Sequence, residues 1–142
     1  MAEFVARHLA RRAGLADAFE FASAATSREE EGNPVYPPAR AELARHGIGC
    51  EGKVARTLQR ADYGRYDLIV GMDEANLRNM RVLFGGDPEG KLSLLLDHTP
   101  AADAGHHGRS VADPWYTGRF DVAWDDISRG CEALLKKLAE DV

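Results

Sequence analysis

The sequence predicts an α/β protein in which a parallel sheet lies between layers of helices. Two apolar runs, "DLIVGM" (67–72) and "KLSLLLD" (91–97), have the length and composition of buried strands. Helical patterns alternate with the strands, which predicts βαβ units with right-handed crossovers. In such folds the chemistry lies at the carboxyl ends of the strands.

The first half of the chain is predicted to contain a helix, a strand and a second helix. Residues 2–13 have an amphipathic helical pattern whose apolar face consists of Phe4, Val5, His8 and Leu9. "FEFASAATS" (19–27) alternates and then becomes small and hydroxylated, which predicts a strand running into a loop. A proline-rich loop follows, and "ARAELARHGI" (39–48) predicts a short helix that stops at Gly47.

The second half contributes both buried strands and most of the helical content. "QRADYGRY" (59–66) predicts a helical turn, and 73–84 predicts a helix that Asp73 caps. Residues 98–118 are predicted to form a long loop without an element of its own, and loops of this length are often functional. A long terminal helix follows, with an inward stripe of Val122, Ile127, Cys131, Leu134, Leu135 and Leu138.

Composition and charge limit the class of protein. The 142 residues suit one domain, and the formal net charge of -5 argues against nonspecific binding to nucleic acid or to acidic membrane surfaces. No apolar run approaches the roughly 18 residues of a membrane span. The two cysteines argue against a disulfide framework and indicate a reducing cytoplasm.

The stretch "CEGKVART" (50–57) has the Cys-x5-Arg spacing of a cysteine-dependent phosphatase. In that chemistry a thiolate attacks phosphorus, while backbone N–H groups and the Arg hold the phosphate oxygens. The surroundings argue against this role, because the stretch follows a helix with two glycines rather than a strand, and Glu51 would repel a phosphate dianion. The sequence therefore favours a connector here, in which Cys50 is no nucleophile.

The segment "ADPWYTG" (112–118) lies in the long loop and is the stronger candidate. An Asp followed by two aromatic residues suits the dephosphorylation of a phenol. The leaving phenolate has a pKa near 10 and needs a proton donor, for which Asp113 is suited. Trp115 and Tyr116 would flank an aromatic substrate. On the chemistry alone, a proline turn with its aromatic residues tucked into the core is an equal alternative.

The remaining polar clusters carry no predicted chemistry. Asp103, His106 and His107 lie in a Gly/Ala-rich loop without a rigid element, so we expect a solvated loop and no metal site. Cys131 falls on the apolar stripe of the terminal helix and is expected in the core. No cofactor is expected.

Four segments in this order resemble the low-molecular-weight protein tyrosine phosphatase family: "SAATS" (23–27), "GNPVYPPARAELARHGI" (32–48), "YDLIVGMDEANLRNM" (66–80) and "ADPWYTG" (112–118). The resemblance covers nearly the whole chain, and its Asp-Pro-aromatic-aromatic segment is the most specific part. It implies a flavodoxin-like fold in which Asp113 is the general acid. It further implies that Trp115 and Tyr116 line the substrate cleft and that Ser23 supports the phosphate loop.

The main departure from the family concerns the start of the chain. "MAEFVARHL" is similar to the helix that follows the family's phosphate loop, so the first central strand, the nucleophilic Cys and the phosphate-binding Arg are expected to be missing. We therefore expect 1–142 to be a single truncated phosphatase-like domain that is inactive as given. Lys53 also stands where the family usually has a His of the network that supports the loop.

For the complete enzyme, the resemblance implies phosphomonoester hydrolysis through a cysteinyl phosphate, with a phosphotyrosine protein or a small aryl phosphate as substrate. Two alternatives stay open: a non-catalytic phosphatase-like binding or regulatory module, and an arsenate-reductase-like protein of the same fold. A missing central strand would expose backbone groups. The sheet is therefore expected to rearrange or to pair with a second copy in a homo-oligomer.

Overall fold

The computed structural model describes residues 1–141. Along the chain its elements are α1 (Ala2–Arg12), α2 (Pro37–Arg45), α3 (Asp62–Arg65), β1 (Ile69–Gly71), α4 (Glu74–Phe84), β2 (Leu92–Leu94), the 3-10 helix η1 (Leu95–His98), α5 (Pro114–Thr117) and α6 (Phe120–Glu140). Within this described part, the helices are too short or too polar to cross a membrane.

The strands β1 and β2 pair in parallel, with Ile69 beside Leu92 and Gly71 beside Leu94. The connection between them carries α4, so this unit is the βαβ crossover that the sequence predicts. Successive side chains of a strand point to opposite faces of the sheet. Ile69 accordingly packs in the cluster that contains α4, whereas Val70 packs against the opposite cluster.

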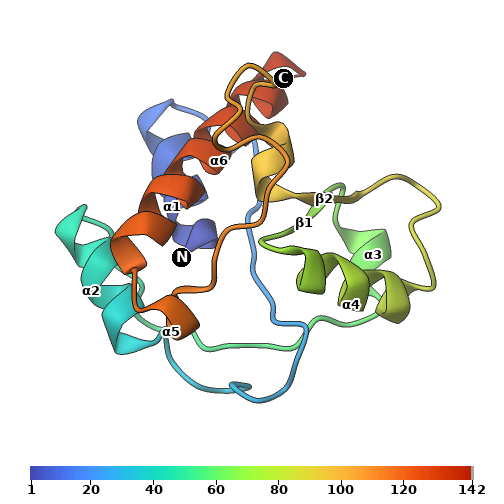
Figure 1. Cartoon of the computed structure of the whole chain (residues 1–142), viewed down its shortest axis with the longest axis horizontal. Helices are drawn as coiled ribbons and strands as arrows, with labels where there is room; N and C mark the ends of the chain where they lie inside the picture. The colour runs from blue at the N-terminus through green and yellow to red at the C-terminus, as the bar shows by residue number, and fades with distance from the viewer. Residues whose placement is uncertain (142) are drawn as a thin grey trace.

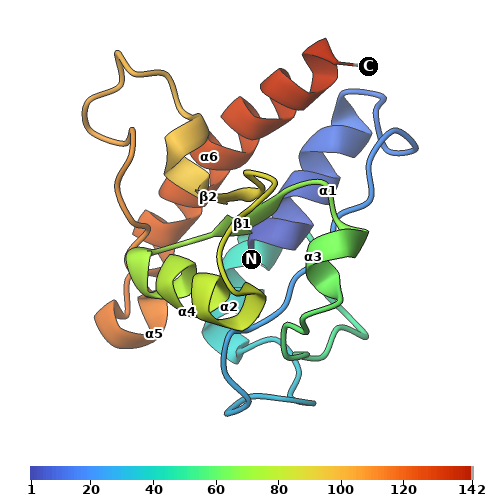
Figure 2. The same cartoon turned by 90° about the vertical axis from the view of Figure 1, so that its right-hand side faces the viewer.

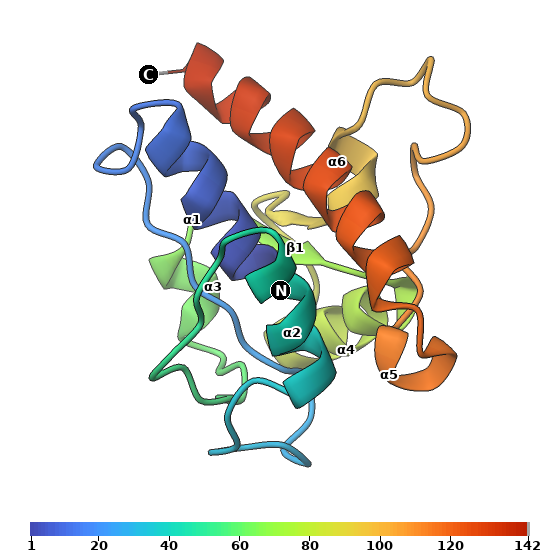
Figure 3. The same cartoon turned by 90° about the vertical axis from the view of Figure 1, so that its left-hand side faces the viewer.

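Helices cover both faces of the sheet, as the predicted fold class requires. Figure 1 shows α1, α2 and α6 on one side of β1 and β2, with α3 and α4 on the other. Figure 2 shows α4 and α3 in front of this arrangement, and Figure 3 shows α1, α2 and α6 together on the opposite side. The larger apolar cluster joins these three helices to η1 through Val5, Leu43, Leu95, Leu96, Ile127 and Cys131.

The predicted helix after β1 is confirmed, and its two ends have clear physical causes. Asp73 Oδ1 accepts a hydrogen bond from Asn76 N at 2.8 Å, while Asn76 Oδ1 accepts one from Asp73 N at 3.3 Å. This reciprocal pair satisfies two N–H groups at the first turn of α4. The helix ends at Gly85, whose φ of 71° places it in the left-handed region that glycine tolerates best.

Four expectations about local structure are wrong. Residues 98–118, expected to contain no element of their own, include α5. The strand predicted over 19–27 does not form, and Ala25 instead makes a single parallel bridge to Thr57. "KLSLLLD" leaves the sheet after Leu94 and continues as η1. Val122, predicted on the inward stripe of α6, is 42% exposed. In the other three cases the residues are apolar, as the prediction assumed. The segments that pack beside them determine which structure forms and which side chains are buried.

Candidate active site at the carboxyl end of the sheet

The segment that contains Asp113 is attached to the carboxyl end of β1. Val111 N donates to Met72 O at 2.8 Å, directly after the last residue of the strand. One residue earlier, Ser110 Oγ accepts a hydrogen bond from Glu74 N at 3.1 Å. These two contacts place the long loop at the edge of the sheet where parallel α/β folds carry their chemistry.

Asp113 itself is exposed and shapes the turn that follows it. It is the N-cap of α5, and its Oδ1 accepts a hydrogen bond from Trp115 N at 2.9 Å. Pro114 occupies the first helical position, where its missing N–H costs nothing. In the described part of the chain, Trp115 N is the group that hydrogen-bonds to this carboxylate, and the residue is exposed, so the side chain is accessible for proton transfer.

The aromatic residues after Asp113 lie at the surface rather than in the core. Trp115 is 52% exposed and Tyr116 is 84% exposed. The Trp115 ring packs against Tyr36, with ring centroids 4.4 Å apart, and the Phe120 ring centroid lies 5.9 Å from that of Tyr36. The alternative of aromatic residues tucked into the core is therefore wrong.

Tyr36 was not singled out from the sequence, although it completes this aromatic group. The signal that marks it is an aromatic residue held between prolines in "NPVYPP", a context in which the backbone is fixed. Tyr36 also precedes α2, so it links the Pro-rich loop to the segment of Asp113.

Ser23 belongs to a different polar group at the start of α1. Its Oγ donates to Oε1 of Glu3 at 2.7 Å. Lys53 Nζ lies 2.7 Å from the same oxygen, and Arg7 pairs with the other oxygen at 2.9 Å. The structure therefore joins Ser23 to Lys53 through the buried Glu3 carboxylate.

The stretch "CEGKVART" is a connector, as the sequence analysis favours. Cys50 is 6% exposed and packs in the core cluster with Val5 and Leu43. Arg56 is occupied by a two-point contact with Asp62, at 3.1 and 3.3 Å. A buried thiol and a neutralised guanidinium cannot act as nucleophile and anion clamp, so this Cys-x5-Arg spacing is a coincidence.

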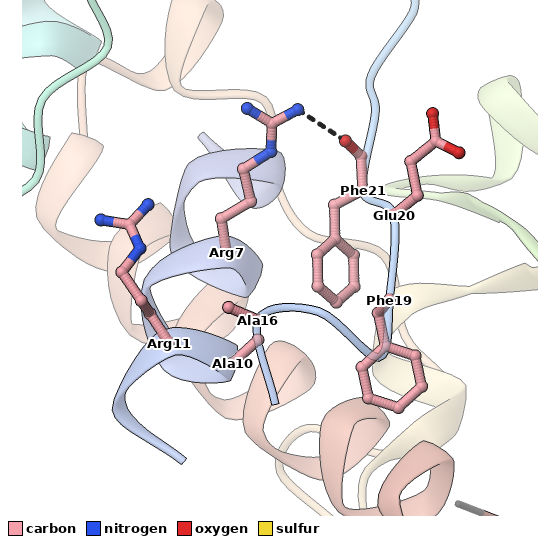
Figure 4. A pocket seen from close by; sticks show the side chains of 7 residues that line it. All are labelled: Arg7, Ala10, Arg11, Ala16, Phe19, Glu20 and Phe21. Carbon is pink, nitrogen blue, oxygen red and sulfur yellow. Dashed lines mark hydrogen bonds between the residues drawn. The ribbon is translucent and has the colours of Figure 1, made fainter. Parts of the chain in front are cut away.

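Two surface hollows lie away from Asp113. One of about 280 Å³ lies between α1 and residues 16–21, and Arg7 crosses it to donate to Phe21 O at 2.7 Å (Figure 4). The other, of about 400 Å³, lies between α2 and the start of α6. Neither is lined by Asp113, Trp115 or Tyr116, although the second hollow borders Gly118, the residue that ends α5.

The loop residues expected in solvent are more ordered than the sequence suggests. His106 has a side chain that is 18% exposed, and its Nδ1 lies 2.9 Å from Asp103 Oδ1. His106 also faces two aspartates of α6, Asp125 and Asp126. The expectation of a fully solvated loop is wrong for His106, because the sequence could not show that α6 packs against it.

Comparison with known proteins agrees with this architecture. The family model described as low molecular weight phosphotyrosine protein phosphatase matches residues 1–142. The chain is 32% identical over 141 residues to the low molecular weight protein-tyrosine-phosphatase YfkJ of Bacillus subtilis, covering 99% of this chain and 88% of that protein. It is also 32% identical to the rat low molecular weight phosphotyrosine protein phosphatase, covering 96% of this chain and 85% of that protein.

Solved structures give the same result. The crystal structure of YfkJ superimposes with a TM-score of 0.92 at 31% sequence identity, covering 99% of this chain and 86% of that one. The low molecular weight protein tyrosine phosphatase from Streptococcus pyogenes gives a TM-score of 0.81 at 28% identity, covering 96% of this chain and 82% of that one. The parallel sheet, the helices on both of its faces and the Asp-Pro-aromatic-aromatic loop therefore fit one conclusion: the chain belongs to the low molecular weight phosphotyrosine protein phosphatase family.

Proposed function

We propose that Asp113 acts as the general acid in phosphomonoester hydrolysis, donating a proton to the phenolate that leaves a phosphotyrosine protein or a small aryl phosphate. The observation that carries this proposal is the hydrogen bond from Val111 N to Met72 O, which holds the Asp113 loop at the carboxyl end of β1. Asp113 Oδ1 is fixed by Trp115 N, and the exposed side chain is accessible for proton transfer.

Trp115 and Tyr116 are proposed to flank the aromatic ring of the substrate. Both rings are exposed on the short helix that Asp113 caps, and the Trp115 ring is held by its contact with Tyr36. A phenyl phosphate ring placed beside them would gain aromatic contact. Ser23 is proposed to act indirectly: its hydrogen bond fixes the Glu3 carboxylate at the start of α1.

We propose that the polypeptide 1–142 alone hydrolyses aryl phosphates negligibly. Both of its cysteines are buried, and Arg56 is paired with Asp62. The cysteinyl phosphate of this mechanism would therefore require a nucleophile from sequence outside 1–142. The test is the turnover of p-nitrophenyl phosphate by purified 1–142, with Cys50→Ser as the comparison. Robust activity that Cys50→Ser abolishes would contradict both this proposal and the connector assignment.

The gene provides the second test. Codons upstream of Met1 that encode an in-frame Cys-x5-Arg-Ser loop would permit expression of a longer chain with a nucleophile. In that chain, Asp113→Asn is expected to lower kcat by about 10²–10⁴-fold, as loss of a general acid does. Asp121→Asn is the matched control, because Asp121 is exposed and pairs with Arg119. Equal activity of both variants would refute the role of Asp113.

Absence of such codons would favour the alternative of a non-catalytic binding or regulatory module. Titration of 1–142 with a phosphotyrosine peptide distinguishes a phosphatase that lacks its nucleophile from a binding module. Weak or undetectable binding is expected, because Arg56 of the Cys-x5-Arg stretch is occupied by Asp62. Tight binding would instead support the module.

A further inference from the structure

We propose that His106, Asp125 and Asp126 bind one Zn²⁺ ion, which fastens the loop 99–112 to α6. The structure brings together one imidazole nitrogen and two carboxylate oxygens, all within 4.8 Å of one another. They come from two separate parts of the fold, since His106 lies in the loop after η1 and the aspartates are adjacent on α6. This site is distinct from the residues assigned to the proposed phosphatase chemistry.

The spacing of the three atoms suits a metal ion better than direct hydrogen bonds. His106 Nε2 lies 3.5 Å from Asp126 Oδ1 and 3.8 Å from Asp125 Oδ2. Both separations exceed the usual limit for a hydrogen bond of about 3.2 Å. In a tetrahedral zinc site with bonds of about 2.0–2.2 Å, two ligand atoms lie about 3.4 Å apart. Small side-chain rotations would therefore bring all three atoms to bonding distance.

The protonation pattern of His106 also fits a metal ligand. Its Nδ1 lies 2.9 Å from Asp103 Oδ1, and an ionised carboxylate can only accept, so Nδ1 carries the proton. In the neutral ring Nε2 is then the nitrogen without a proton, and it is the one that lies near the two α6 carboxylates. The same two oxygens, Asp126 Oδ1 and Asp125 Oδ2, accept hydrogen bonds from Arg109 and Arg129, so each carboxylate would bind the ion beside its guanidinium partner. A carboxylate that orients a ligating histidine in this way is common around zinc.

The surrounding charges leave the site attractive to a divalent cation. Arg109 donates two hydrogen bonds to Asp126, at 2.8 and 3.0 Å, and Arg129 donates one to Asp125 at 3.1 Å. Asp103, Asp125 and Asp126 carry three negative charges, and the two arginines carry two positive charges. The group therefore has one net negative charge when His106 is neutral. The Asp126 side chain is 4% exposed and held by Arg109, so one ligand is already fixed in place.

The loop that supplies His106 is held at several points. His107 Nδ1 lies 2.7 Å from Thr99 O, and Gly108 N donates to Leu96 O at 3.0 Å. The imidazole is therefore presented by a fixed turn rather than by a free loop. Asp125 is 56% exposed, so water can reach the ion and occupy the fourth coordination position. A bound ion would tie this turn to α6 a few residues before the Asp113 segment.

The test is isothermal titration of metal-free, untagged 1–142 with zinc chloride, together with the thermal midpoint Tm in the same buffer. One ion is expected per chain. With free Zn²⁺ at 100 times Kd, Tm is expected to rise by roughly 5–10 °C. His106→Gln and Asp125→Asn are each expected to weaken binding by more than about tenfold, and Asp103→Asn by about 10–100-fold through loss of orientation.

Two variants serve as controls. His8→Gln removes a histidine from α1, and Asp121→Asn removes an exposed aspartate from the first turn of α6. Both should bind Zn²⁺ as tightly as the unaltered chain. Circular dichroism without metal shows whether each variant is folded, and Asp125→Asn alters an exposed side chain that should not disturb folding. Absence of one-to-one binding, or unchanged affinity in folded His106→Gln and Asp125→Asn, would overturn the proposal.

Discussion

Lys53 Nζ lies 2.7 Å from Oε1 of Glu3, a carboxylate whose side chain is only 1% exposed. Burial by itself would raise the pKa of Glu3, but the hydrogen bonds from Lys53 and Ser23 and the charge of Arg7 outweigh it and lower that pKa. The position of Lys53 shows a physical role for this side chain. It is one of two cations that neutralise a buried charge at the start of α1.

Replacement of Lys53 by Met should therefore destabilise the fold. Glu3 keeps Arg7 and Ser23 but loses its closest cation, so the free energy of unfolding is expected to fall by about 1–3 kcal/mol. Urea unfolding monitored by circular dichroism measures the change. Lys136→Met, on the exposed face of α6, is the matched control and should stay within about 0.5 kcal/mol of the unaltered chain. Equal effects of both substitutions would show that the Glu3 contact contributes nothing.

The Glu42 carboxyl should make the protein sensitive to acid. Arg45 Nη2 donates to Glu42 at 3.2 Å, and His46 Nε2 lies 3.0 Å from it. The hydrogen bond from Arg45 lowers the pKa of Glu42, burial opposes this, and the His46 contact lowers it further. The folded pKa thus lies below the unfolded value of about 4.3, so this stabilisation is complete above that pH. It is lost as the pH falls through the folded pKa.

Glu42→Gln should remove this part of the pH dependence. Its unfolding free energy is expected to change less between pH 5 and pH 3 (about the range of the Glu42 titration) than that of the unaltered chain. Urea titrations at several pH values measure the two slopes. Glu132→Gln, at an exposed position of α6, provides the comparison. A slope that Glu42→Gln leaves unchanged would exclude Glu42 as an acid-sensitive group.

Gly130 allows α6 to approach η1 closely. A Cβ at this position would lie 2.5 Å from Leu95 Cγ, closer than real side chains allow. Gly130→Ala is expected to lower the unfolding free energy by about 1–3 kcal/mol, although alanine favours helices. Gly64→Ala in α3 is the matched control, since a Cβ there meets nothing within 4 Å, and it should be neutral or slightly stabilising. A neutral or stabilising effect of Gly130→Ala would show that the two elements can separate without cost.

The two thiols should be protected in the folded protein. Cys131 is 2% exposed, and burial raises the pKa of its thiol to about 12. Cys50 is 6% exposed in the same apolar cluster. Reaction with Ellman's reagent at pH 8 (below the usual thiol pKa of about 8.5) is therefore expected to be slow for both thiols and to become rapid in denaturant. Fast labelling of native Cys50, located by mass spectrometry, would contradict its burial and reopen the question of its reactivity.

Local sequence signals predicted most of the helices and both strands of the sheet. Asp73 and Gly85 mark the ends of α4 because capping depends on residues within one turn of the helix. The predicted strand over 19–27 failed for the opposite reason. A strand needs a neighbouring backbone to pair with, and alternation in the sequence does not supply one.

The candidate site likewise contains residues that are close together in the sequence and one residue that only folding brings to them. Asp113, Trp115 and Tyr116 could be proposed from the sequence because they lie close together in the chain and carry functional groups that suit the proposed chemistry. Tyr36 lies far from them in sequence, and only folding places its ring 4.4 Å from Trp115. The sequence "NPVYPP" does not show that Tyr36 contacts Trp115.

The sequence was enough to predict the α/β class, the family resemblance, the segment proposed to carry the general acid and the connector role of "CEGKVART". These depend on local composition, spacing and order along the chain. The tertiary structure alone decided that Lys53 neutralises Glu3 and that Arg56 is occupied by Asp62. It also decided that His106 faces Asp125 and Asp126 across a loop and a helix. Contacts of this kind join segments that are far apart in the sequence. Their packing energy depends on all of these segments together, so no single segment predicts them.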